Sequence, residues 1–295
     1  MGLEDYEKAG KIAREALENW SKKIKPGVKL LEIAEGAEGE IREKGAGLAF
    51  PVNISLNGQA AHYTPEHKCE KVFGDKDIVK LDVGVHVNGF IGDTALTIDL
   101  SGEQGKLLEA SEAGLEAAIA GMKPGVEVGE IGALVEAEIK KRGFKPIENL
   151  TGHRLEQFKL HAGTEIPNIK TASPHRIQEG DVFAVEPFAT NGAGHVSDGS
   201  QVEIFMFLEK RPVRLRESRR LMTYSEEKFS GLPFAERWLY KDFNSKLLLA
   251  SALRELVGFG VLRAYPILSD SGKGLVSQAE KTVIIEKDGA RVLTN

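Results

Sequence analysis

Five residues have side chains of the types that bind metal ions: Asp82, Asp93, His153, Glu186 and Glu280. The four carboxylates lie within or beside apolar, strand-like runs, where an ionised group is costly unless another charge compensates it. Oxygen ligands together with one imidazole suit Mn, Fe(II), Co or Zn. The set therefore predicts a dinuclear metal site, and such a site indicates a hydrolase.

The chemistry of two neighbouring cations suits the hydrolysis of an amide. Two ions about 3.5–4 Å apart can lower the pKa of a bound water from 15.7 towards about 7, and one of them can polarise a carbonyl. The sequence has no HExxH motif, which excludes a single-zinc protease of that type. No Ser or Cys lies in a nucleophile-elbow motif, and no Walker phosphate loop is present.

The chain contains an internal duplication that must position these residues. Residues 25–45 read KPGVKLLEIAEGAEGEIREKG and residues 123–143 read KPGVEVGEIGALVEAEIKKRG, an offset of 98 positions (123 − 25). Each copy follows a helical segment, at about 3–24 or 103–121, and reads as a Pro-Gly break, a second helix and a Gly stop. Two related half-domains with a site between them are expected.

Predicted strands extend the duplication and put the carboxylates in matching positions. DIVKLD aligns with DVFAVE, which matches Asp82 with Glu186, and DTALTI aligns with EKTVII, which matches Asp93 with Glu280. By strand alternation Asp82 points away from the apolar face of its strand. One such carboxylate alone would be an ordinary solvent-facing residue, but four in matched repeat positions indicate one shared site.

The spacing within each pair of carboxylates differs between the halves. The first pair is separated by 11 positions (93 − 82), which fits a β-hairpin that turns at Asn88-Gly89. The second pair is separated by 94 positions (280 − 186), so an insertion of 83 positions (94 − 11) is expected.

The insertion sets the predicted domain organisation. We predict a mostly helical insertion subdomain over residues 195–270, with Asn244 or Ser245 capping its last helix and Leu247, Leu248, Ala252 and Leu256 along one face. The catalytic domain then comprises residues 1–194 plus 271–295. Its half-repeats are about 1–100 and 101–194 plus 271–295.

Histidines near the predicted strands add catalytic candidates. His153 and His161 lie in the Gly-flanked segment NLTGHRLEQFKLHAG, and His62 in AAHYTP occupies the similar place in the first half. A lone histidine is more often structural than catalytic. Two of them in one segment close to Glu186 favour a functional interpretation.

Composition bounds the class of protein. The chain has 295 residues, 41% of them hydrophobic, enough for one large domain or two. Its net charge of −5 argues against a protein that mainly binds nucleic acid, and we expect no sequence-specific nucleic acid partner. The single cysteine, Cys69, excludes a disulfide framework and suits a cytoplasmic location. No apolar run of membrane-spanning length occurs, and no membrane association is expected.

At this point the sequence resembles the methionine aminopeptidases, specifically the type 2 branch in its short archaeal form. The motifs that carry the resemblance are FPVNISLNGQAAHYTP, LDVGVHVNGFIGDTALT, NLTGHRLEQFKLHAG, IPN, FAVEPFAT, LPFAERWL and QAEKTVII. They cover essentially the whole chain. The resemblance implies an α/β (α+β) duplicated pita-bread fold with a helical insertion subdomain. It implies removal of the N-terminal methionine from nascent proteins and peptides.

The resemblance also implies a role for each site residue. Asp82 would chelate one ion, Asp93 and Glu280 would bridge the pair, and His153 and Glu186 would complete the second ion. The catalytic residues would be His62, His161 and Glu186, with Glu186 as the proton shuttle, and the substrate-binding residues would be Phe50, His62, His161 and Tyr265. Two divalent ions (Co, Mn, Fe(II), Zn or Ni) would be the cofactors.

One departure from the family pattern concerns the residues beside the last ligand. The family usually has a bulky residue before this glutamate and a histidine after it, whereas this chain has Ala279 and Lys281. By alternation both lie on the face opposite Glu280, so we expect the metal site to survive and the local packing to differ.

Two other functions stay open at this stage. A prolidase or aminopeptidase P would share the five ligands but usually carries a large N-terminal domain, for which Asp82 comes too early. A relative that binds ribosomes or other proteins would have lost ligands that this chain keeps. The expected partners are N-terminal Met peptides, with a transient ribosome contact as a secondary interpretation, and a monomer is expected.

Overall fold

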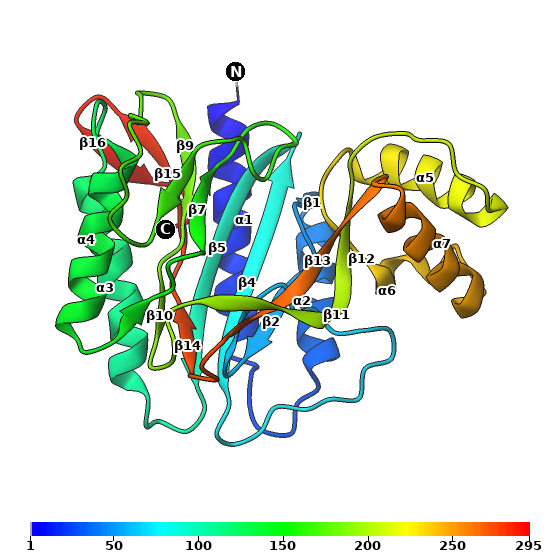
Figure 1. Ribbon diagram of the computed structural model, residues 1–295, viewed down its shortest axis with the longest axis horizontal. Coiled ribbons are helices and arrows are strands. Elements are labelled where there is room, and N and C mark those ends of the chain that lie inside the picture. Colours follow the sequence, from blue (N-terminus) through cyan, green and yellow to red (C-terminus); the bar gives the residue numbers. More distant parts are fainter. Residues whose placement is uncertain (1) are drawn as a thin grey trace.

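The computed structural model describes residues 2–295 as a sheet-centred body with helices on its outside (Figure 1). The helices are α1 (Leu3–Ser21), α2 (Leu30–Glu43), α3 (Gly105–Gly121), α4 (Val128–Lys141), α5 (Arg216–Phe229), α6 (Glu236–Leu239) and α7 (Lys246–Gly258). The strands are β1 (Gly47–Leu48), β2 (Asn53–Leu56), β3 (Gln59–Ala61), β4 (Ile78–Val87), β5 (Phe90–Asp99), β6 (Lys145–Pro146), β7 (Thr151–Arg154), β8 (Glu165–Pro167), β9 (Val182–Val185), β10 (Phe188–Thr190), β11 (Val196–Phe207), β12 (Phe234–Ala235), β13 (Leu262–Asp270), β14 (Val276–Gln278), β15 (Lys281–Glu286) and β16 (Gly289–Val292).

The two predicted copies adopt the same local structure. Gly27 and Gly125 both take the left-handed conformation, with φ of 85° and 89°, as the Pro-Gly break requires. Their N–H groups donate to Phe73 O and Ile177 O, each at 2.8 Å, so each break is fixed by the strand-like segment of its own half. The predicted duplication is therefore visible in backbone hydrogen bonds as well as in sequence.

The first half is built on the predicted hairpin. β4 and β5 pair antiparallel from Ile78↔Asp99 to Val87↔Phe90, and α1 packs on both strands. Asn88 and Gly89 turn the chain with φ of 52° and 87°, positive at both central residues as a type I′ turn requires. The apolar residues of β4 join one buried core cluster with α1 and α2.

The two halves meet along β5 and the segment around Glu280. Ala95 and Glu280 form an antiparallel bridge, with Ala95 O accepting from Glu280 N at 3.0 Å. Thr94 Oγ1 donates to Glu280 O at 2.9 Å, and Thr97 Oγ1 donates to Gln278 O at 2.7 Å. We call this junction the seam. On its far side, α3 and α4 pack against each other and against the strands of the second half (Figure 1).

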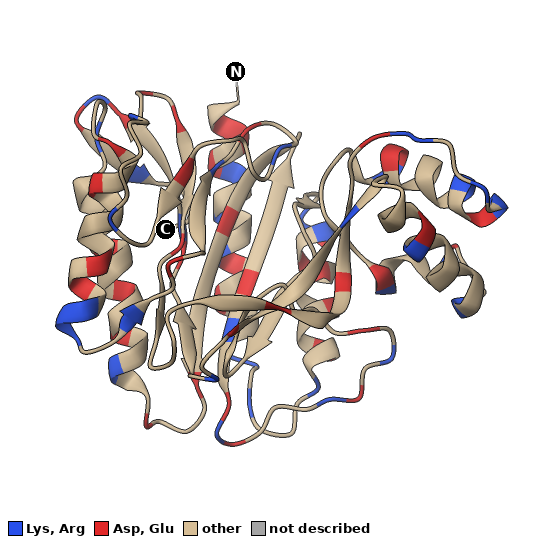
Figure 2. Ribbon diagram, viewed as in Figure 1, with Lys and Arg blue, Asp and Glu red and all other residues tan. Residues whose placement is uncertain are grey.

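The segment 195–270 combines helices with strands that the sequence analysis did not expect. β11 and β13 pair antiparallel and frame it, and β13 also pairs with β3 of the first half. Helices α5 and α7 pack together at the end of the molecule farthest from α4 (Figure 1). Figure 2 shows that basic and acidic residues occur together on the helices at both ends of the molecule.

The last helix of this segment corrects one prediction and confirms another. Ser245 is the N-cap of α7, and its side chain accepts from Leu248 N. The buried face consists of Leu249, Ala252, Leu253 and Leu256, whereas Leu247 and Leu248 are 77% and 54% exposed. The predicted face was wrong at its first turn because four consecutive apolar or small residues leave the helical phase open. Across residues 2–295 no helix combines the length and apolarity that crossing a bilayer needs.

Candidate active site

The structure brings all nine predicted site residues to the wall of a single cavity of about 70 Å³. Asp82 and Asp93 come from the facing strands β4 and β5, and His153 comes from β7. Glu186 directly follows β9, and Glu280 directly precedes β15, on the second-half side of the seam. Both halves therefore contribute side chains to one site, as the duplication predicted.

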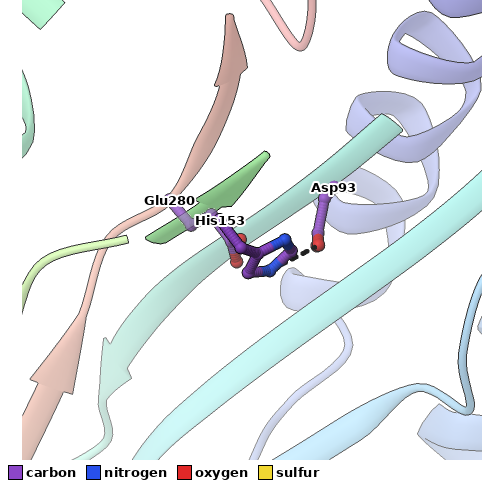
Figure 3. Close-up of side chains that lie close together, drawn as sticks. All are labelled: Asp93, His153 and Glu280. Atoms are coloured by element: carbon purple, nitrogen blue, oxygen red, sulfur yellow. Dashed lines mark ion pairs between the residues drawn. The ribbon is translucent and has the colours of Figure 1, made fainter. Parts of the chain in front are cut away.

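Three of the metal-type side chains form a tight group. Donor atoms of Asp93, His153 and Glu280 all lie within 4.8 Å of one another, and all three residues are buried. Figure 3 shows both carboxylates directed towards the imidazole of His153, with each residue contributed by a different segment of the chain. His153 Nε2 lies 3.8 Å from Asp93 Oδ2 and 3.5 Å from Glu186 Oε1. Asp82 lies beside this group in the same cavity.

Burial and mutual repulsion oppose ionisation of the carboxylates. Desolvation raises the pKa of Asp82 to about 7. It raises the pKa of Asp93, Glu186 and Glu280 well above their ordinary values, and the neighbouring carboxylates add to this rise. Desolvation, with His161 nearby, holds the pKa of His153 well below its ordinary value. The imidazole is therefore neutral, and the carboxylates need nearby positive charge to ionise together.

The residues fit a site for divalent cations. Four carboxylates and a neutral imidazole form the hard-oxygen-plus-nitrogen donor set that such ions prefer. Among the described residues, Asp82 Oδ1 and Asp93 Oδ1 are buried oxygens without a hydrogen-bond partner. Buried acceptors are normally satisfied, so these oxygens are available for a cation.

Two further histidines stand over this group. The ring of His161 lies 4.3 Å from that of His153, centre to centre. Desolvation, together with His62 and Arg263, lowers the pKa of His161 to about 4, although the residue reaches solvent. His62 Nδ1 lies 3.2 Å from Pro266 O, and burial lowers the pKa of His62 as well. Both imidazoles are therefore neutral near pH 7 and can give or accept a proton.

The rest of the cavity wall is mostly apolar. Phe50 lies over Gly84, where a Cβ would come within 2.1 Å of the phenyl ring, so the glycine makes room for this residue. Tyr265 packs edge-on against His62 at 5.2 Å between ring centres. Ala61, Leu160, Ile204 and Pro233 complete the apolar lining.

Sequence reasoning missed two polar residues of the site. Gln278 is 1% exposed, and its Nε2 donates to Glu186 Oε2 at 3.3 Å and to Glu280 Oε2 at 3.4 Å. Its position two residues before Glu280, on the same face by strand alternation, was the available signal. Asn53 pairs in register with Asp82 and lines the cavity. The proximity of Asn53 to Asp82 becomes visible only from the pairing of β2 with β4 in the structure.

The structure shows where the two residues beside Glu280 lie. Ala279 and Lys281 line a cleft of about 560 Å³ between α1 and α3, which Thr94 and Leu115 also line. Lys281 Nζ donates to Asn295 Oδ1 at 3.1 Å and does not reach the site. Glu280 itself stays within the tight group.

Comparison with known proteins decides the family. Metallopeptidase family M24 matches residues 4–214. The methionine aminopeptidase of Pyrococcus abyssi is 46% identical over 295 residues, which cover 100% of both chains. The chain belongs to the methionine aminopeptidases of metallopeptidase family M24.

Solved structures agree on the fold of this methionine aminopeptidase. A methionine aminopeptidase from Thermotoga maritima superimposes with a TM-score of 0.73 at 22% identity, covering 100% of this chain and 96% of that one. A thermophilic Arx1 superimposes with a TM-score of 0.88 at 19% identity, covering 99% and 90%. The predicted pita-bread fold is thus confirmed, and the predicted insertion contains β11, β12 and β13 in addition to helices α5, α6 and α7. The enzyme is a metal-dependent aminopeptidase.

Proposed function

We propose that the enzyme removes the N-terminal methionine from nascent proteins and peptides with two divalent ions held by Asp82, Asp93, His153, Glu186 and Glu280. The observation that carries this proposal is that all five side chains, contributed by both halves of the duplication, line the same cavity. Asp82 would bind one ion, Asp93 and Glu280 would be shared by both ions, and His153 and Glu186 would complete the coordination of the second ion. When bound, the ions would lower the pKa of a water molecule and polarise the scissile carbonyl.

The protein side chains have separate tasks in this proposal. Glu186 takes a proton from the attacking water and passes it to the leaving amine, a task that an ionised carboxylate within the cavity can perform. His161 donates a hydrogen bond to the carbonyl oxygen as negative charge develops on it. His62 positions the substrate and assists proton transfer.

The shape of the cavity supports release of one residue at a time. A volume of about 70 Å³ is far below the roughly 300–1,000 Å³ of pockets for drug-sized ligands, so it admits little more than one side chain. Phe50 and Tyr265, with the other apolar lining residues, would contact the unbranched thioether chain of methionine.

Finer assignments follow from the same site. The donor set suits Co, Mn, Fe(II), Zn or Ni, and we propose that the type 2 motifs and the insertion place the enzyme in the type 2 branch. We further propose action as a monomer in the cytoplasm, where the free, buried Cys69 stays reduced. We propose two domains. The catalytic domain comprises residues 1–194 and 271–295, and the insertion subdomain comprises residues 195–270.

A peptide panel tests the function directly. We expect the metal-loaded enzyme to release Met from Met-Gly and Met-Ala peptides and to leave N-acetylated forms and Xaa-Pro bonds intact. A chelator should abolish the activity, and adding the metals singly should identify those that restore it. Cleavage of Xaa-Pro peptides without release of Met would overturn the proposal.

A further inference from the structure

A buried ion pair joins the first half of the molecule to the segment 195–270. Glu38 on α2 and Arg237 on α6 contact each other directly, and both side chains are 2% exposed. Removing two charges from water is costly, and the attraction between them compensates only when further hydrogen bonds satisfy both groups. The contacts of each partner therefore show what the pair is built to hold.

The glutamate holds the segment that carries the apolar wall of the cavity. Glu38 Oε1 accepts from Val52 N at 3.2 Å, and its Oε2 accepts from Trp238 Nε1 at 2.7 Å. Val52 lies between Phe50 and Asn53, two residues that line the cavity. One carboxylate thus fixes the backbone of this wall against α2.

The arginine holds the segment that follows His62. Arg237 donates through its NH1 group to Thr64 Oγ1 at 2.5 Å and to Pro65 O at 3.2 Å. Thr64 Oγ1 in turn donates to Val52 O at 2.7 Å. The ion pair, Thr64 and Val52 therefore form a closed ring of contacts that links the two chain segments at the cavity.

His62 needs such support because its backbone is strained. Its φ is +67°, in the left-handed region that residues with a Cβ rarely occupy. A conformation of this kind persists only when the surrounding structure fixes it. On the imidazole side His62 is held by Pro266 O and Tyr265, both on β13. On the backbone side the fixed point is Thr64, two residues along the chain.

We propose that Arg237, paired with Glu38 and acting through Thr64, is a positioning residue for His62. This inference rests on the proposed function, because it assigns His62 a task in peptide hydrolysis. Arg237 does not line the cavity, and it acts by fixing where the imidazole of His62 stands. Residues from the segment 195–270 thereby hold His62 at both its backbone and its ring.

The sharpest test breaks the ring at Thr64 and leaves the ion pair intact. Thr64→Val keeps the shape of the side chain and removes the hydroxyl, whereas Thr64→Ser keeps the hydroxyl and serves as the matched control. With a Met-Ala peptide we expect Thr64→Val to lower kcat on the order of 10-fold to 100-fold, since small misplacements in an active site cost rate. We expect Thr64→Ser to stay within about 3-fold and metal content to be unchanged in both.

A double-mutant comparison separates positioning from general stability. In a His62→Ala background, Thr64→Val should cause no further loss of kcat, because the group it positions is gone. In the metal-free protein, the NMR resonances of the His62 imidazole should shift in Thr64→Val and not in Thr64→Ser. If Thr64→Val fails to fold, Arg237→Lys, which keeps the charge but cannot reach both partners, takes its place under the same criteria.

The outcomes are distinct. Equal losses of kcat from Thr64→Val in the two backgrounds, or equal effects of the valine and serine variants, would overturn the positioning role while the wild-type enzyme stays active. A wild-type enzyme with no activity on Met peptides would instead refute the proposed function itself.

Discussion

The two halves of the molecule share a backbone plan but use it differently. In the first half, β4 and β5 are ten-residue strands joined by a two-residue turn. In the second half, the equivalent β9 and β15 have four and six residues, and the segment framed by β11 and β13 lies between them in sequence. The uninterrupted hairpin supplies Asp82 and Asp93 to the cavity, and the interruption of the other brings in β11 and β13, from which Ile204 and Tyr265 line the cavity.

The halves also differ at the position that supplies the imidazole. His153 on β7 pairs with Ala184, two residues before Glu186. The same register in the first half pairs Ser55 on β2 with Lys80, two residues before Asp82. Lys80 is 1% exposed, and its Nζ donates to Asn57 O at 2.7 Å. One half thus places His153 where the other places Ser55, and Ala184 where the other places a buried lysine, so the duplicated plan fixes positions and not chemistry.

The largest effect is expected at the seam, where the halves share their ligands. Asp93→Ala should reduce peptide release to an undetectable level and lower metal occupancy, because Asp93 belongs to the tight group with His153 and Glu280. Activity assays and elemental analysis check both effects. Asp288→Asn, in the exposed turn between β15 and β16, is the control and should behave like the wild type. Full activity in the Asp93 variant would show that the ligand assignment is wrong.

The histidines in similar places of the two halves should differ from the ligands in a measurable way. His161→Ala should retain metal but lose on the order of 10²–10⁴-fold in kcat, because an oriented donor near the reacting carbonyl is removed. His62→Ala should also retain metal. Steady-state kinetics with parallel metal analysis makes the comparison. Loss of metal in either variant would move that histidine into the ligand set.

A smaller effect on stability should reveal the charge buried in the first half. Burial raises the pKa of Asp82 from 3.8 to about 7, so the folded metal-free protein holds a proton that the unfolded chain releases. This proton's contribution to the free energy of unfolding is fully present below about pH 4. It decreases by about 1.4 kcal/mol per pH unit as the pH rises towards 7, and it is lost above that pH.

Asp82→Asn isolates this contribution because asparagine does not ionise. In chelator-treated protein, the variant and the wild type should have similar free energies of unfolding near pH 4, and the variant should be the more stable at pH 8. Divalent metal should reverse the order at pH 8. Denaturant unfolding at several pH values measures the difference, and a difference independent of pH would contradict the burial of this charge.

The smallest effect is expected from Lys80→Met. The side-chain nitrogen of Lys80 donates to Asn57 O, which is not part of the site, so we expect metal content to be unchanged and kcat/KM to stay within about 3-fold. Burial lowers the pKa of Lys80 well below its ordinary value. Because the side chain therefore carries little charge, the methionine variant loses little charge–charge interaction. A large loss of activity would show that the first half contributes a further group to the site.

The sequence predicted those features that depend on local pattern or on repetition. The hairpin at Asn88-Gly89 follows from turn chemistry, and the convergence of the four carboxylates on one cavity follows from matching the halves. Strand alternation places Lys80 on the same side of β4 as Asp82, away from the apolar face, yet Lys80 is buried, because alternation gives the side of a strand and not what covers it.

Contacts between distant segments could not be predicted in the same way. Gln278 reaches Glu186 across 92 positions, and Arg237 reaches Glu38 across 199. Each depends on how whole elements pack, which no short motif encodes. The frame of β11 and β13 was missed for a related reason, since its strands pair across more than fifty residues of intervening helix and loop.

The seam predicts how the protein would behave if its chain were expressed as two separate fragments. Asp82 and Asp93 come from the first half of the chain, and the other three proposed ligands, His153, Glu186 and Glu280, come from the second half. A fragment ending in the loop before α3 and a fragment beginning there would each carry an incomplete coordination set. Neither piece would work alone, and mixing them with divalent ions should restore catalysis by fragment complementation.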